Sequence, residues 1–152
     1  MIETESMNQI TVWVAAWEMQ CCGEPFKTGD SVDWTVAKWK FDLPPVEGID
    51  SIDYCYDNHG TGNEQEFQLK GIVSKIQTVF EKYELDPAQN VLRPVSGKLF
   101  DFDGEADGYQ YKGSGYYTDL DKEEDASTYG FSAYFVQLSQ VEITPKTIEK
   151  DI

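Results

Sequence analysis

The chain has 152 residues, of which 28 are acidic and 12 are basic, so its formal net charge is −16. This length fits a single domain. The excess of acids argues against a protein that contacts nucleic-acid phosphates, which needs clustered lysine and arginine, and against docking on an anionic membrane surface. The longest apolar run, Val12–Trp17, is far too short to cross a bilayer.

The composition is that of a folded protein in a reducing compartment. Apolar residues make up 40% of the chain and aromatic residues 14%, whereas acidic disordered chains are poor in aromatic residues. The three cysteines, Cys21, Cys22 and Cys55, are too few and odd in number for a disulfide framework. The first seventeen residues lack the basic start and apolar core of a signal peptide. The expected location is therefore the cytoplasm.

The N-terminal part of the chain predicts two strands joined by a structured loop. Residues 1–6 are polar and are expected to be a loose end, with Met7 as an alternative start to Met1. Residues 10–17 are rich in β-branched and aromatic side chains, which is typical of a strand. In residues 31–39 every second side chain is apolar, which indicates a half-buried strand.

The middle of the chain contains an acidic connection and an ambiguous apolar element. Residues 42–66 hold seven acids and no lysine or arginine, with Ile49 and Ile52 as apolar anchors, and predict a loop with a short strand or helical turn. In residues 69–85 the apolar spacing matches a helix, but β-branched residues are frequent and favour a strand. We expect a strand there, with a helix as the alternative.

The C-terminal part predicts further strands around a second acidic segment. Residues 91–95 and 98–100 are short apolar pieces. Residues 101–125 hold nine acids and two lysines together with glycines and tyrosines, which suggests a long surface hairpin or loop. Residues 129–143 read as one or two strands. The two acidic segments together account for fourteen of the sixteen net negative charges.

Several short strands separated by turns predict an all-β fold, a small SH3- or OB-like barrel or a sandwich. A helix over residues 69–85 remains the alternative to the strand expected there. The single domain is expected to span residues 7–146, which include the acidic segments 42–66 and 101–125, and a polar tail is expected at 147–152.

One stretch of sequence is distinctive. Trp17-Glu-Met-Gln-Cys-Cys-Gly-Glu-Pro-Phe26, followed by Gly29-Asp30-Ser-Val32-Asp-Trp34, resembles a family of small bacterial proteins classified only as a domain of unknown function. Shorter matches occur at His59-Gly60, Gly71-Ile-Val73 with Ile76, Pro94-Val-Ser-Gly97 and Tyr134-Phe-Val-Gln-Leu138. The resemblance implies a small soluble bacterial β-protein and supplies no activity. The acidic, aromatic region 101–125 departs from the family pattern.

A candidate metal site consists of Cys21, Cys22, Cys55 and His59. Three thiols and one imidazole are a ligand set that suits tetrahedral zinc. However, structural zinc sites mostly use ligand pairs separated by two to four residues, and adjacent side chains in a strand diverge. The alternative is that these cysteines are small buried apolar residues. A cysteine nucleophile would have to use His59, the only histidine, and the surrounding acids would oppose its activation.

Oxygen ligands for calcium are a further possibility. Asp101–Asp107 alternates acids with a glycine turn, and Asp119–Glu123 follows nearby. An EF-hand loop is excluded, because its sixth position would be Ala106 and its twelfth Lys112. The competing interpretation is a solvated acidic hairpin. Paired carboxylates for glycoside hydrolysis have no pattern to support them.

The sequence favours a non-enzymatic acidic domain that binds another protein through that partner's basic surface, because opposite charges steer such encounters. An inhibitor, an immunity protein or a phosphate-mimicking decoy would have this character. The alternatives are a zinc protein, catalytic or not, and a domain whose acidity serves only solubility. The residues expected to contact the partner are Asp101, Asp103, Glu105, Asp107, Tyr109, Tyr111, Tyr116, Tyr117, Asp119, Asp121, Glu123, Glu124 and Asp125.

Overall fold

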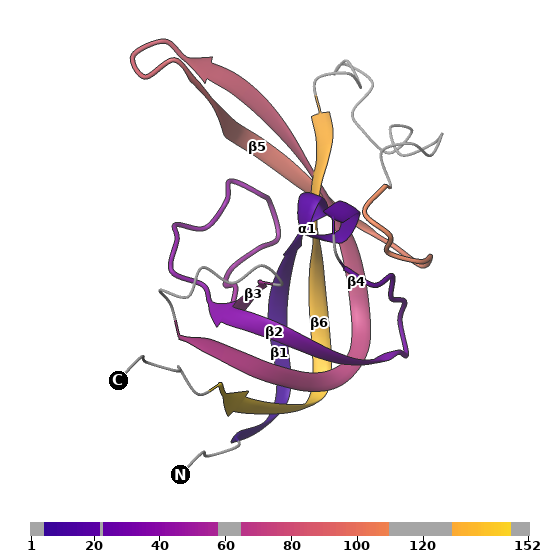
Figure 1. Cartoon of the computed structure of the whole chain (residues 1–152). Coiled ribbons are helices and arrows are strands. Elements are labelled where there is room, and N and C mark those ends of the chain that lie inside the picture. Colours follow the sequence, from indigo (N-terminus) through magenta and orange to yellow (C-terminus); the bar gives the residue numbers. More distant parts are fainter. Residues whose placement is uncertain (1–4, 22, 58–64, 110–128, 147–152) are drawn as a thin grey trace.

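The computed structural model describes residues 5–21, 23–57, 65–109 and 129–146 (Figure 1). They form one six-stranded sheet and one short helix, so the predicted all-β fold is confirmed. The strands are β1 (Glu5–Ala15), β2 (Ser31–Lys38), β3 (Tyr54–Tyr56), β4 (Glu66–Asp86), β5 (Val91–Asp101) and β6 (Tyr129–Pro145), and the helix is α1 (Ala16–Cys21). Within these ranges no helix combines the length and the apolar character that crossing a membrane requires.

The sheet curls back on itself into a barrel-like shape. Its strand order is β2-β3-β1-β6-β4-β5, and β2 also pairs with β4 from Ser31 opposite Ile72 to Ala37 opposite Glu66. Five strands therefore form a ring of neighbours, and β5 extends this ring only through β4. The ring is uneven, because β3 contributes only three residues and lies parallel to β1. In Figure 1 the β4–β5 hairpin projects away from this curled body.

The ambiguous segment 69–85 is part of β4, so its strand interpretation is confirmed and the helical alternative is wrong. The apolar spacing resembles a helix because the ladder between β4 and β6 shifts register between Lys70 and Ile72, between Val73 and Lys75, and between Val79 and Phe80. Each shift changes which side chains face the interior, and it interrupts the simple alternation of a strand.

Some element boundaries differ from the expectation. β1 begins at Glu5, within the segment expected to be loose, and it ends at Ala15. The next two residues of the predicted strand open α1, where Trp17 is 58% exposed. The short apolar pieces 91–95 and 98–100 are one continuous strand, β5, and the last predicted element is the single strand β6.

Apolar side chains are buried on both faces of the sheet. The larger core lies inside the curled sheet, and its members include Val12, Val14, Trp34, Val36, Leu69, Val73, Ile76, Tyr134, Val136 and Leu138. On the outer face, Val46, Ile49 and Ile52 from the acidic connection pack against Val79, Ala133 and Phe135. Burying such a large apolar side chain contributes about 1.5–3 kcal/mol. These three anchors hold the connection on the sheet, and Glu47 and Asp50 remain exposed.

The projecting hairpin has one apolar face. Tyr83 pairs with Pro94 and Leu85 pairs with Leu92 across β4 and β5, and the side chains of Tyr83, Leu85 and Leu92 are 43%, 56% and 67% exposed. At the base of this face Glu81 is only 4% exposed, and it accepts a hydrogen bond of 3.3 Å from the Tyr83 hydroxyl. Burial, together with the negative charge of Glu81, raises the pKa of Tyr83 from 10.0 to about 12.

The raised pKa of Tyr83 predicts that the folded protein loses stability in strong alkali. Because its folded pKa lies above the unfolded value of 10.0, its contribution is complete below pH 10 and is lost as the pH rises towards 12. We expect the melting temperature of the native chain to fall more steeply over this interval than that of Tyr83→Phe. Thermal melts followed by circular dichroism at stepped pH would measure both, and parallel declines would contradict the assignment.

Candidate functional site

The start of the second acidic segment, residues 101–109, is a strip of chain in which exposed acids alternate with less exposed residues. Asp101, Asp103 and Glu105 are exposed, whereas Ala106 and Gly108 are buried. The alternation persists although the backbone bends at Gly104 and Gly108. The alternation of acids in the sequence therefore reflects solvent-facing positions. We call Asp101, Asp103, Glu105 and Asp107 the acidic ridge.

Hydrogen bonds of the inward residues attach the ridge to the sheet body. The Ala106 amide donates to the Phe26 carbonyl at 2.7 Å, and the Phe26 amide donates to the Ala106 carbonyl at 3.4 Å. The Gly108 amide donates to the Tyr134 hydroxyl at 2.8 Å, and the Gln20 side-chain amide donates to the Gly108 carbonyl at 2.7 Å. The ridge carboxylates thus lie on a backbone that hydrogen bonds to Phe26, Tyr134 and Gln20 hold in place.

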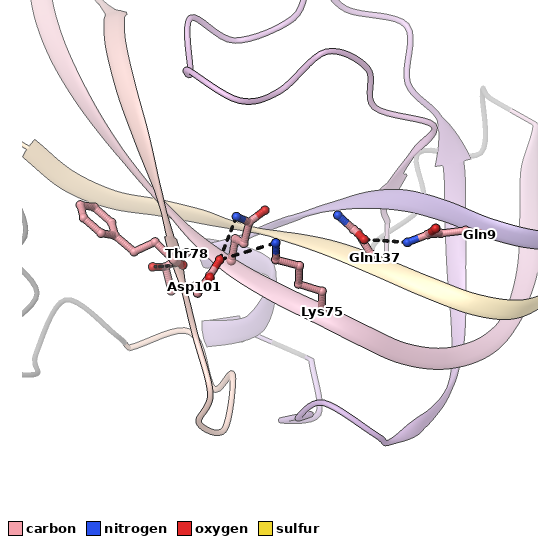
Figure 2. Close-up of polar contacts among 7 residues, drawn as sticks. Gln9, Lys75, Thr78, Asp101 and Gln137 are labelled. Atoms are coloured by element: carbon pink, nitrogen blue, oxygen red, sulfur yellow. Dashed lines mark hydrogen bonds and ion pairs between the residues drawn. The ribbon is translucent and has the colours of Figure 1, made fainter.

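Asp101 differs from the other acids of the ridge because it interacts with β4. Figure 2 shows its carboxylate between side chains of that strand. Asp101 Oδ1 accepts a hydrogen bond of 3.1 Å from Gln77 Nε2 and lies 3.7 Å from Lys75 Nζ. Both charges are largely exposed, so the pair contributes about 0–1 kcal/mol. Its negative charge is partly offset, and the outward charge of the ridge comes mainly from Asp103, Glu105 and Asp107.

The structure describes only part of the predicted partner-binding set. The four ridge acids and Tyr109 are placed, and Tyr109 is 37% exposed at the end of the strip. Its amide donates to Asp107 Oδ1 at 2.9 Å. The remaining members of the set lie outside the described residues: Tyr111, Tyr116, Tyr117, Asp119, Asp121, Glu123, Glu124 and Asp125. The second half of the calcium hypothesis, Asp119–Glu123, lies outside them as well.

The structure describes two of the four predicted zinc ligands, Cys21 and Cys55. Cys21 is the exposed last residue of α1, and Cys55 is the half-buried middle residue of β3, where its neighbours Tyr54 and Tyr56 point into the core. Cys22 and His59 fall outside the described residues. Among the residues that the structure describes, no three His, Cys, Asp or Glu side chains are grouped as metal ligands. The zinc site stays a prediction.

A pocket of about 550 Å³ lies beside the strip, and sequence reasoning did not identify it. Phe26 connects the two features, since its backbone pairs with Ala106 and its side chain lines the pocket. The described residues that line the pocket are Glu24, Pro25, Phe26, Asp30, Ser31, Val32, Asp33, Trp34 and Tyr56. All of them except Tyr56 belong to the stretch of sequence that carries the family resemblance, which was the available signal.

Hydrogen bonds hold two of the acids that line this pocket, Asp30 in a turn and Asp33 on β2. The Gly29 amide donates to the Val73 carbonyl at 2.8 Å, and the Val73 amide donates to the Asp30 carbonyl at 2.9 Å, so the turn is bonded to β4. Asp30 Oδ2 in turn accepts a hydrogen bond of 3.0 Å from the Lys27 amide. Asp33, on β2, accepts a hydrogen bond from the side-chain amide of Gln68 on β4. Both carboxylates are therefore held in place by neighbouring groups.

Comparison with protein-family models matches residues 8–140 to a family described as "Family of unknown function (DUF6578)". The chain belongs to this family. The match covers β2 to β5 whole, most of β1 and β6, the ridge and the pocket. Searches of the curated proteins and of the solved structures find no match.

Gly108 provides a test of how the ridge is attached. Its φ is +92°, and an added Cβ would lie 2.9 Å from Met19 Cβ and 3.0 Å from the Gln20 amide nitrogen. Gly29 has a similar φ of +96° but open space around it. Gly29→Ala should therefore cost about 1–2 kcal/mol from backbone strain alone. Gly108→Ala should cost about 2–4 kcal/mol, because overpacking adds to that strain.

Urea denaturation would measure both costs, and amide exchange at Ala106 would report whether the ridge detaches. We expect faster exchange at Ala106 in Gly108→Ala than in Gly29→Ala. Equal destabilisation by the two substitutions, with Ala106 protected in both, would show that the Gly108 contact does not hold the ridge.

Proposed function

We propose that this chain is a non-enzymatic acidic β-domain of the bacterial cytoplasm that binds another protein through that partner's basic surface. An inhibitor, an immunity protein and a phosphate-mimicking decoy are the forms that such a role takes. The observation that carries the proposal is the exposure of Asp103 and Glu105, followed by the half-buried Asp107, on a backbone attached to the sheet.

The attachment of the ridge supports binding because an already ordered backbone loses less conformational entropy when it docks on a partner. A flexible acidic loop would lose conformational freedom when it docked, and that loss would weaken the complex. In the ridge the backbone is already fixed at Ala106 and Gly108. The negative charges are therefore presented in a set arrangement.

The charge distribution supports steering toward a basic surface. Asp103 is exposed and Asp107 is half-buried, and neither forms an ion pair with a described residue, so no fixed counter-charge offsets them there. Neighbouring charges of one sign raise the association rate of an oppositely charged partner by about 10-fold to 1,000-fold at low salt. The pocket beside the ridge adds Glu24, Asp30 and Asp33 to the same end of the molecule.

The experiment compares two triple variants of equal net charge. One neutralises the ridge with Asp103→Asn, Glu105→Gln and Asp107→Asn. The other neutralises three exposed acids of the first acidic segment with Asp42→Asn, Glu47→Gln and Asp50→Asn. A partner would be captured from bacterial lysate on the immobilised native chain at low salt, released with salt, identified and purified. Its association rate with each variant would then be measured by surface plasmon resonance.

We expect the ridge variant to lower the association rate by about tenfold or more, and the control variant to leave it within about twofold. Asparagine at position 107 still offers an oxygen to the Tyr109 amide, so the local turn is preserved. If the two variants behave alike, bulk charge is the cause and the ridge is not the binding surface. If no basic protein is retained, or if retention does not depend on salt, the proposal is wrong.

A further inference from the structure

The β4–β5 hairpin exposes a group of apolar side chains on one side. Tyr83, Leu85 and Leu92 are 43%, 56% and 67% exposed, and Pro94, which pairs with Tyr83, is exposed as well. Side chains that are directly opposite each other in an antiparallel ladder lie on the same side of the sheet. These four residues therefore form one surface, which we call the hairpin face.

The hairpin face continues an apolar surface that the chain covers elsewhere. On the same side of β4, Val79 is buried under the acidic connection. The connection reaches β5 at Gly97, where it forms a bridge through Val46, and a Cβ added to Gly97 would lie only 2.6 Å from Val46 Cγ2. From Tyr83 outward the side chains are exposed, so the described part of the connection leaves the hairpin face open.

The outer part of the hairpin is a ribbon of two strands (Figure 1). The last pair between β4 and β6 is Lys82 opposite Tyr129, whereas β4 and β5 stay paired as far as Asp86 opposite Val91. Among the described residues, residues 83–94 therefore have no third strand beside them. A lone two-stranded hairpin is marginally stable in water and gains stability when its apolar face packs on another layer. The ribbon thus calls for a second layer on the hairpin face.

The electric charge of the hairpin identifies the kind of surface that can supply this layer. Residues 81–98 hold three acids and three bases, so their net charge is zero in a chain of net charge −16. On the side opposite the hairpin face, Arg93 Nε lies 3.1 Å from Asp86 Oδ2. A basic protein is not steered to a neutral surface, whereas two copies of this chain can approach each other here with little repulsion.

The second layer packs on the face of the hairpin and not along its edge. β5 is the last strand in the sheet order, but Pro94 lacks a backbone donor, and the β4–β5 register shifts between Lys82 and Tyr83. Proline and bulges are features with which proteins prevent pairing along an open edge. Face-to-face packing, with the two layers about 10 Å apart, needs no backbone hydrogen bond from that edge.

We propose that the chain forms a two-fold dimer in which the hairpin faces of two copies pack against each other. A two-fold contact joins the same surface of both copies, so that surface must be complementary to itself, as an uncharged apolar face is. Two apolar patches of about 300–600 Å² each would bury roughly 600–1,200 Å² in total, which reaches the lower range of specific interfaces. The dimer forms without the ridge, so it is independent of the proposed binding to a basic partner.

Sedimentation equilibrium of the full native chain tests the dimer. A concentration series up to about 1 mM would be measured at low and at moderate salt. We expect a reversible equilibrium between monomer and dimer that shifts toward the dimer as salt screens the repulsion between two chains of net charge −16. A chain that stays monomeric at every concentration and salt would overturn the dimer.

Two adjacent residues of β5 provide matched variants. Leu92 lies on the hairpin face, whereas Val91, which is 42% exposed, pairs with Asp86 on the opposite side. Leu92→Gln should weaken the dimer by about tenfold or more, because each dimer loses two buried leucine side chains. Val91→Gln should change the dimer constant by no more than about twofold, as is usual for a side chain that stays in solvent. Equal weakening by both variants, with unchanged circular dichroism, would show that the hairpin face is not the interface.

Contacts between the two copies separate face packing from edge pairing without any substitution. Isotope-filtered NMR spectra of a mixture of ¹³C,¹⁵N-labelled and unlabelled native chain would detect only protons that approach each other across the interface. We expect contacts from the Leu85 and Leu92 methyl groups to the Tyr83 ring or to Leu92 of the other copy. Contacts between the β5 backbones of the two copies, or contacts confined to other parts of the chain, would overturn the proposed packing.

Discussion

The acidic ridge and the neighbouring pocket both depend on the contacts of one side chain in the core, Tyr134 of β6. Its ring is fully buried and packs against Phe26, Phe102 and Phe131 at centroid distances of 5.9, 6.1 and 5.0 Å. Its hydroxyl accepts the amide proton of Gly108 at 2.8 Å. Tyr134 therefore connects the pocket, through Phe26, with both ends of the ridge backbone. This apolar core and the buried Tyr134 hydrogen bond, together with the backbone pair of Phe26 and Ala106, fix the positions of charges that would otherwise repel one another.

Much of the fold could be predicted from local patterns. Strand β2 shows a clean alternation around Trp34, and the apolar anchors Ile49 and Ile52 were recognisable within an acidic connection. Strand β4 was ambiguous, because register shifts against β6 give its buried residues a nearly helical spacing. Helix α1 was missed because it has only six residues and follows directly on an apolar strand. Its residues Glu18 to Gln20 favour a helix, but the preceding run of aliphatic and aromatic residues dominated the prediction.

The candidate site was less accessible to prediction, since long-range contacts create it. The acids of 101–107 were expected on the surface, and the strip indeed exposes Asp101, Asp103 and Glu105. The burial of Ala106, directly after them, follows from its backbone pairing with Phe26, eighty residues earlier in the chain, which no local pattern reports. The pocket likewise depends on a turn that is bonded to Val73. Composition therefore revealed where the charge lies, and the topology determined which charges meet.

The central position of β6 also has a consequence for how the chain reaches its native state. β6 lies between β1 and β4, and its ladder with β1 extends to the pairing of Glu5 with Ile143. During synthesis on the ribosome, β1 and β4 lack their shared neighbour until β6 has been made, so the ring of strands closes late. Closing such long loops is slow, and it leaves strand edges and apolar faces open to other chains. The excess of acids in residues 42–66 and 101–125, which are made before β6, makes unfinished chains repel one another during this interval and so opposes their association.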